Sequence, residues 1–144
     1  AARAWPVAPT LLDGDEDKFC AFKLARAALA ASGTVTLELG LAGVPMVVAY
    51  QVDPIAAQLR YFIKARSMVL ANLVIEENAF PEFVQADVNG VTLAESLAPL
   101  LGDTPARAAQ LAALARIPAR LKLPSGTPSE AAAAIVLRYA GLSL

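Results

Sequence analysis

Three consecutive small residues, Ser32, Gly33 and Thr34, are the part of this sequence best suited to bind a ligand. They follow a short apolar run that is typical of a buried strand, and they precede a segment that favours a helix. At such a turn the backbone N–H groups and the positive end of the helix dipole converge, and glycine lets a phosphate approach closely. The turn therefore predicts a phosphate-binding site, with an ordinary strand–helix turn as the alternative.

Four further polar side chains could complete such a site. Glu38 lies one helical turn after Thr34, where its carboxylate could accept hydrogen bonds from ribose hydroxyls or remain a solvated helix residue. Asn72 interrupts an apolar run, which predicts either buried hydrogen-bond partners or a place at the ligand-binding edge of a sheet. Glu82 and Gln85 are three residues apart, on one face of an expected helical turn, with surface decoration as the alternative.

The composition excludes several kinds of chemistry. The 144 residues contain no histidine, so the commonest metal ligand and the commonest general base are both missing, and the single cysteine, Cys20, cannot form an internal disulfide. Four of residues 13–17 are acidic, but they lack the spaced ligands of a calcium loop and are better explained as acids at a helix N-terminus. A net charge of −1 without a long basic tract argues against nucleic-acid binding. We expect no metal site, no cofactor and no nucleophile–base pair.

The elements that must position these residues alternate between strands and helices in the first half of the chain. We expect strands over residues 7–12, 27–31, 46–50 and 68–75. We expect the intervening helices over residues 15–26, 33–42 and 53–66. After residue 78 we expect only helical segments, over residues 81–85, 91–101, 104–118 and 127–139. The pattern predicts an α/β fold with a parallel sheet, followed by an all-helical C-terminal segment.

The length of 144 residues suits one domain, and no apolar run reaches the roughly 18–20 residues that a membrane span requires. The sequence does not start with methionine, so we expect it to be part of a longer protein. The expected helix over residues 55–66 places Tyr61 and Phe62 among Arg60, Lys64 and Arg66, a mixture that suits a membrane surface. Packing of this helix under the sheet is the alternative.

Several segments occur in the order found in a known family. Residues 31–38 and 42–50 resemble the C-terminal half of the lipid-A-disaccharide synthases. The further matches are Pro54, residues 70–73, Pro81, Glu82, Gln85, residues 92–94, residues 100–101 and residues 127–132. The likeness covers almost the whole chain. Two departures bear on donor affinity: Gln51 stands where the family usually has arginine, and Ala71 where it usually has proline.

The resemblance implies a GT-B glycosyltransferase, which has two Rossmann-like domains with a cleft between them. Residues 1–102 would form the domain that binds the UDP part of UDP-2,3-diacylglucosamine, and residues 103–144 would be helices that cross back to the missing N-terminal domain. Ser32, Gly33 and Thr34 would receive the diphosphate, with Thr36 nearby, and Glu38 would bind the ribose. The polar positions that would line the rest of the donor site are Asn72, Glu82 and Gln85.

The full enzyme of this family transfers diacylglucosamine to 2,3-diacylglucosamine 1-phosphate with inversion, releasing UDP without a required metal or cofactor. The resemblance places the catalytic residues in the missing half, so we expect this chain alone to be inactive. It also implies a cytoplasmic protein that can associate with the inner-membrane surface, and the C-terminal helices could join two copies in a homodimer. The alternatives are another GT-B UDP-sugar transferase or epimerase, and a nucleotide-binding module without catalysis.

Overall fold

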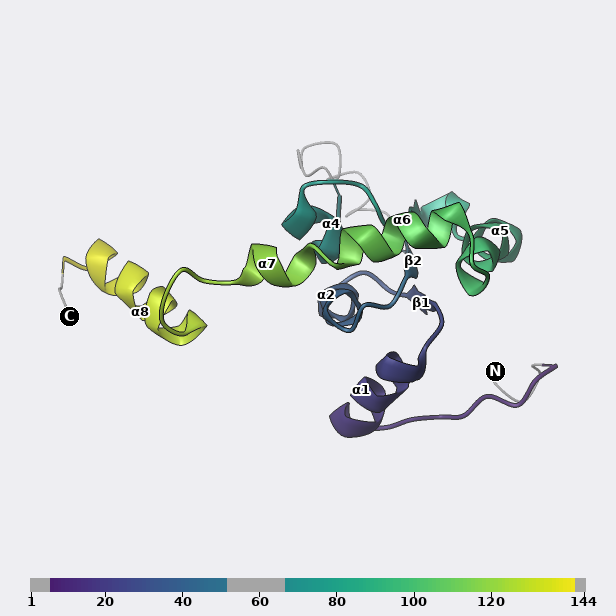
Figure 1. Ribbon diagram of the computed structural model, residues 1–144, viewed down its shortest axis with the longest axis horizontal. Coiled ribbons are helices and arrows are strands. Elements are labelled where there is room, and N and C mark those ends of the chain that lie inside the picture. The colour runs from purple at the N-terminus through teal and green to yellow at the C-terminus, as the bar shows by residue number, and fades with distance from the viewer. Residues whose placement is uncertain (1–5, 52–66, 142–144) are drawn as a thin grey trace.

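A three-stranded parallel sheet forms the centre of the protein (Figure 1). The computed structural model describes residues 6–51 and 67–141. The strands are β1 (Ala28–Ala30), β2 (Met46–Tyr50) and β3 (Glu82–Val84), in the spatial order β1-β2-β3. The helical elements are α1 (Asp15–Leu24), α2 (Thr34–Leu41), α4 (Leu70–Ile75), the 3₁₀ turn η2 (Gln85–Asp87), α5 (Gly90–Leu101), α6 (Pro105–Leu114), α7 (Ile117–Leu121) and α8 (Pro128–Tyr139). The protein is thus a mixed α/β fold with a Rossmann-like parallel sheet, as predicted.

The central strand β2 pairs in parallel with both neighbours, with Ala28 opposite Met46 on one side and Val48 opposite Glu82 on the other. Met46, Val47 and Val48 are completely buried, which is why this strand is continuously apolar. The segment from β1 through α2 to β2 is the predicted βαβ unit. Because all three strands run in the same direction, the residues that follow β1, β2 and β3 lie at one edge of the sheet.

The core joins this sheet to helices from distant parts of the chain. Its buried apolar residues include Leu39 of α2, Ile75 of α4 and Ile117 of α7. Helix α2 approaches α7 so closely that a Cβ atom added to Gly40 would lie 2.7 Å from Ile117 Cδ1. Packing against α7 therefore favours a glycine here, in the last turn of α2, even though glycine disfavours a helix.

Helix α6 is tied to the sheet by polar side chains. The buried side chain of Gln110 accepts a hydrogen bond from Met46 N at 2.8 Å and donates one to Met46 O at 3.1 Å. Arg107 donates to the carbonyl oxygens of Arg26 and Leu100, so that the chain before β1 is held against the end of α5. Helix α6 therefore contributes directly to the packing of the sheet.

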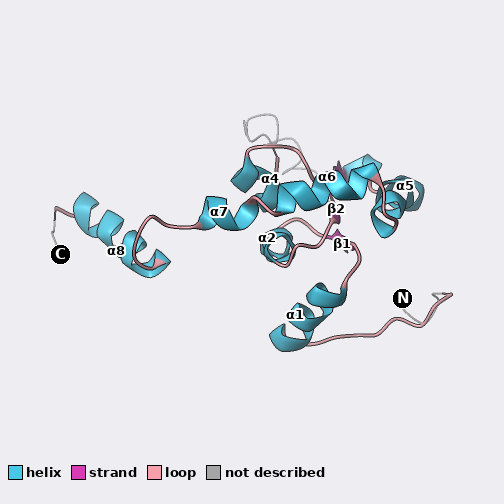
Figure 2. Ribbon diagram, in the orientation of Figure 1, coloured by secondary structure: helices cyan, strands magenta, loops and turns pink. Residues whose placement is uncertain are grey.

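Helix α8 lies apart from the sheet, beyond the loop that follows α7 (Figures 1 and 2). None of its residues from 128 to 139 is buried. Its N-terminus carries a capping box: Thr127 Oγ1 accepts from Glu130 N, and the Glu130 carboxylate accepts from Thr127 N. The loop over residues 123–126 separates α8 from α7.

Three sequence-based predictions of secondary structure are wrong. Residues 7–12 form no strand: Val7 and Leu11 are 76% and 82% exposed, with no packing to hold them extended against the sheet. Residues 68–75 contain the helix α4 instead of a strand, because Ala71, Asn72 and Ile75 share one buried helical face. A short apolar run cannot be assigned to strand or helix by its pattern alone.

The third error follows from the second. Residues 81–85 are not a helical turn; the third strand, β3, is formed by Glu82–Val84, and η2 follows it. Pro81 lacks an N–H group but can begin a strand, and its carbonyl oxygen accepts a hydrogen bond from Val48 N at 2.9 Å. The change from alternating elements to helices alone therefore comes after residue 84, not at residue 78. The helix expected over residues 53–66 lies outside the described residues.

Candidate functional site

The turn between β1 and α2 is open at the edge of the sheet. Gly33 has φ +137°, a conformation that other residues rarely adopt, and the space where its Cβ would lie has no atom within 4 Å. No side chain of the described residues caps the N-terminus of α2. The turn therefore offers backbone N–H groups and the positive end of an eight-residue helix to an approaching anion.

Two hydroxyl groups hold this turn in place. Thr36 is fully buried, and its Oγ1 donates to Gly33 O at 2.9 Å. Ser32 Oγ donates to the carbonyl oxygen of Met68 at 2.9 Å, which joins the turn to the segment that precedes α4. The turn is thus stabilised from inside by Thr36 and from a neighbouring segment by Ser32.

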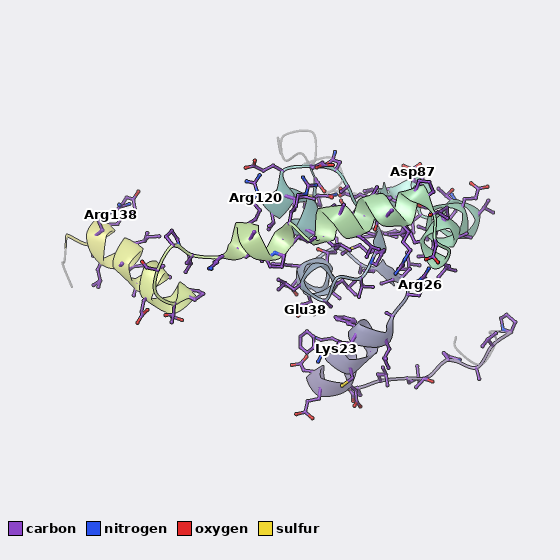
Figure 3. The ribbon with its side chains drawn as sticks, viewed as in Figure 1. Lys23, Arg26, Glu38, Asp87, Arg120 and Arg138 are labelled. Carbon is purple, nitrogen blue, oxygen red and sulfur yellow. The ribbon has the colours of Figure 1, made fainter. Side chains whose placement is uncertain are left out.

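Glu38 lies on the next turn of α2, on the side that faces α1 (Figure 3). Its Oε2 atom is 3.1 Å from Lys18 Nζ, and the same ammonium group is 2.9 Å from Asp15 Oδ1. Hydrogen bonds to Asp15 and then to Glu38 raise the pKa of Lys18 above its usual value. The proposed ribose acceptor is therefore oriented by a cation from α1, a contact that nothing in the sequence spacing indicates.

Glu82 is the centre of a polar cluster behind the turn. Its carboxylate accepts hydrogen bonds from Tyr50 Oη at 2.5 Å, Ser67 Oγ at 2.7 Å and Met68 N at 3.1 Å. The three donors come from the end of β2 and from the segment that precedes α4. The strand position of Glu82 makes this convergence possible; the helical turn expected from the sequence would not have paired it with β2.

Asn72 belongs to the same cluster. Its amide oxygen accepts from Phe80 N at 3.0 Å, while its amide nitrogen donates to Phe80 O at 3.0 Å and to Ser67 Oγ at 3.2 Å. Asn72 is 2% exposed, so of the two predicted possibilities the structure shows the buried side chain with hydrogen-bond partners. It lies in a helix, not at the end of a strand.

Gln85 follows directly after β3, at the same edge of the sheet as the Ser32 turn. Its φ of +56° is left-handed, which is uncommon for a residue other than glycine and costs free energy. The change of direction after β3 separates it from Glu82, so these two residues do not share a helical face.

Tyr50, Ser67 and Lys18 also belong to this region, although the sequence did not single them out. Tyr50 ends an apolar strand, and Ser67 is 5% exposed in the segment that leads to α4. Ser67 and Asn72 also line a hollow of about 270 Å³, together with Leu73, Glu76 and Asn78. Only the tertiary structure brings these side chains together, since Tyr50 and Ser67 are 32 and 15 residues from Glu82 in the chain, and Lys18 is 20 residues from Glu38.

The described residues show neither a metal-binding group nor a membrane-spanning helix. Across residues 6–51 and 67–141, acidic and cysteine side chains do not gather in a group of three that could hold a metal ion. Within the same ranges, every helix is too short or too polar to cross a membrane.

A parallel sheet with an open strand–helix turn at the carboxyl ends of its strands defines the chain as a Rossmann-like α/β protein, a class that binds ligands at that edge. More specifically, the chain belongs to the lipid-A-disaccharide synthetase family, whose family model matches residues 7–136. This agrees with the resemblance found in the sequence.

The curated relatives carry the same name and are longer. The chain is 49% identical over 138 residues to lipid-A-disaccharide synthase of Rhodopseudomonas palustris (strain BisB18), and 47% identical over 138 residues to that of Nitrobacter hamburgensis. Each alignment covers 95% of this chain but 35% of the relative. A third, from Rhodospirillum centenum, is 41% identical over 95% of this chain and 34% of its own length. The chain therefore spans about a third of the length of these relatives. No solved structure matches it significantly.

Proposed function

We propose that this chain is the donor-nucleotide-binding part of a lipid-A-disaccharide synthase. The reaction would transfer diacylglucosamine from UDP-2,3-diacylglucosamine to 2,3-diacylglucosamine 1-phosphate and release UDP. The observation that carries the proposal is the open Ser32–Gly33–Thr34 turn, at the sheet edge, in a chain of this family. Such a turn suits the diphosphate, the part of the donor that carries most of its charge.

The binding groups would be as follows. Backbone N–H groups of the turn would receive the diphosphate, because Gly33 leaves the space beside the backbone open. The Glu38 carboxylate, held by Lys18, would accept hydrogen bonds from the ribose hydroxyls. Gln85, at the end of β3, would border the same cleft. Thr36, Asn72 and Glu82 would support the site from behind, since each has polar atoms engaged with neighbouring protein groups.

The rest of the enzyme would supply the acceptor site and the catalytic base. In the proposal, residues 1–102 form the donor domain and the helices after residue 103 reach toward the missing part. Helices α7 and α8 carry exposed apolar side chains that such a contact would cover, namely Leu121, Ile135, Val136 and Tyr139.

A homodimer through the same helices is the alternative, and a light-scattering mass would distinguish the two. The acylated substrates would bring the cytoplasmic enzyme to the inner-membrane surface.

A pair of glycine substitutions in the full-length enzyme tests this proposal. Gly33→Ala places a side chain at φ +137° in the open turn, whereas Gly43→Ala places one at φ +73° beyond the other end of α2. Both strain the backbone without a clash, but only the first blocks the turn. We expect Gly33→Ala to abolish UDP release with both lipid substrates present, and Gly43→Ala to retain it. Equal activity of the two variants contradicts a role of the turn in donor binding.

A further inference from the structure

We propose that Glu82 is a positioning residue, which holds the Ser32 turn in its ligand-binding geometry by way of Met68. The inference rests on the proposed function for the identity of the ligand. The link from Glu82 to the turn is argued from contacts within this chain alone. It gives roles to Tyr50 and Ser67, which the sequence did not indicate, and it sets Glu82 behind the donor site instead of in contact with the donor.

The connection runs through a single residue. Met68 N donates to the Glu82 carboxylate at 3.1 Å, and Met68 O accepts the hydroxyl of Ser32 at 2.9 Å. Glu82 is thus two hydrogen bonds from the turn. Since Tyr50, the last residue of β2, also donates to Glu82 at 2.5 Å, the carboxylate joins β3 to the end of β2 as well.

This position requires a group that only accepts hydrogen bonds. The Ser67 hydroxyl has one proton, which it donates to Glu82, and its oxygen already accepts from Val69 N at 3.0 Å and Asn72 Nδ2 at 3.2 Å. A glutamine at position 82 would place its NH₂ group either against this occupied oxygen or against the N–H of Met68. Both orientations lose a hydrogen bond, so a carboxylate is needed although glutamine has nearly the same shape.

The same geometry limits what Ser32 can do. Its one hydroxyl proton is donated to Met68 O, so this side chain cannot also donate to a phosphate oxygen while the contact persists. Ser32 would therefore serve the ligand by fixing the direction of the backbone N–H groups that follow it. Pre-organisation of this kind raises affinity because binding does not have to order the turn.

A double-mutant cycle on UDP affinity, measured by calorimetric titration of the full 144-residue chain, tests the inference. When two side chains act through one path, the double variant loses no more affinity than the weaker-binding single variant. When they contact the ligand independently, the free-energy losses of the two single variants add. We expect Glu82→Gln and Ser32→Ala each to weaken UDP binding about fivefold to tenfold, and the double variant to be no weaker than Glu82→Gln. The matched control is Glu95→Gln, an exposed residue of α5, which should leave the affinity unchanged. Multiplied losses in the double variant overturn the positioning role.

Amide hydrogen exchange provides a readout that needs no ligand. In Glu82→Gln the amides of Met68 and of residues 33–34 should exchange faster, while those of Val47 and Val48 in the central strand stay protected. Tyr50→Phe removes one hydrogen-bond donor to Glu82, whose carboxylate keeps the bonds from Ser67 and Met68. This variant should therefore stay folded and show the same local pattern of exchange more weakly. If exchange rises at Met68 but not in the turn, Glu82 does not act on the turn. If the wild-type chain fails to bind UDP, the proposed function fails, while exchange still decides the structural link.

Discussion

Lys18 Nζ lies 3.1 Å from Glu38 Oε2, so that an ion pair joins α1 to α2 one turn beyond the open Ser32–Gly33–Thr34 turn. Both side chains are about one-third exposed, at 33% and 30%. Water therefore screens the pair, and its main effect is to orient the Glu38 carboxylate.

The raised pKa of Lys18 predicts how this contact depends on pH. Because the folded-state pKa lies above the unfolded-state pKa, the contribution to stability is complete below the unfolded value of about 10.4 and is lost as the pH rises through the folded value. We expect Lys18→Met to lower the melting temperature slightly at pH 8 and to have no effect near pH 12. Thermal unfolding of both proteins at the two pH values measures this, and a difference that persists at high pH contradicts it.

The contact between α2 and α7 predicts the effect of Gly40→Ala. The added methyl group would lie 2.7 Å from Cδ1 of the fully buried Ile117. Overpacking costs about 1–3 kcal/mol, of which alanine's better helix propensity returns up to about 1 kcal/mol. We therefore expect a lower free energy of unfolding in urea.

A second substitution checks the cause of that loss. Ile117→Val removes the Cδ1 atom that clashes, so Gly40→Ala should cost little in that background. Gly90→Ala, at a glycine with open space around it, is the control and should be nearly neutral. A loss from Gly40→Ala that Ile117→Val does not reduce would show that the cause is not this clash.

Gln110 hydrogen-bonds to the backbone N–H and C=O of Met46, as a neighbouring strand would. Met46 lies two residues before Val48, where β2 begins to pair with β3. Gln110→Leu keeps the volume but leaves the N–H and C=O of Met46 without these hydrogen bonds. A buried polar group left unpaired costs about 1–3 kcal/mol, so we expect a loss of about 2 kcal/mol or more for the two groups. Chemical denaturation measures it. Gln110→Ala should cost still more, because it adds a cavity; a near-neutral Gln110→Leu would refute the role of the hydrogen bonds.

The capping box of α8 predicts the opposite pH dependence from Lys18. Hydrogen bonds from the backbone and then the side chain of Thr127 lower the pKa of Glu130. Its stabilising effect is therefore present above the unfolded pKa of about 4.3 and is lost as the pH falls through the folded value. As the pH falls from 6 to 3, amide exchange in α8 of the wild type should rise relative to its intrinsic rate at each pH. In Glu130→Gln the exchange, after correction for its intrinsic pH dependence, should stay constant over that range.

Much of the fold could be predicted because its signals are local. The small residues before Thr34, together with Gly43 and Pro45, mark the ends of α2. Thr104 and Thr127, where the last two helical segments were expected to begin, cap α6 and α8. These signals depend on neighbouring residues, which a sequence pattern contains. The βαβ unit and the C-terminal helices follow from them.

The identity of the third strand could not be predicted in this way. Residues 68–75 and Glu82–Val84 are both short and apolar enough for a strand, and the choice depends on which segment reaches β2 in register. The Glu82 cluster was missed for the same reason, since its hydrogen bonds to Tyr50 and Ser67 connect parts of the chain that only folding brings together. The predicted ligand contacts of every site residue stay predictions, namely those of Ser32, Gly33, Thr34, Thr36, Glu38, Asn72, Glu82 and Gln85.

Calorimetric titration of the 144-residue chain with UDP, ADP and GDP is the most direct test of donor binding. A UDP-sugar site must recognise the smaller uracil base as well as the diphosphate, whereas a general phosphate turn binds all three nucleotides alike. We predict saturable binding of UDP at least tenfold tighter than that of ADP or GDP, and its loss in Gly33→Ala but not in Gly43→Ala. Equal affinity for the three nucleotides, or no binding of UDP by the folded chain, would contradict the proposed function.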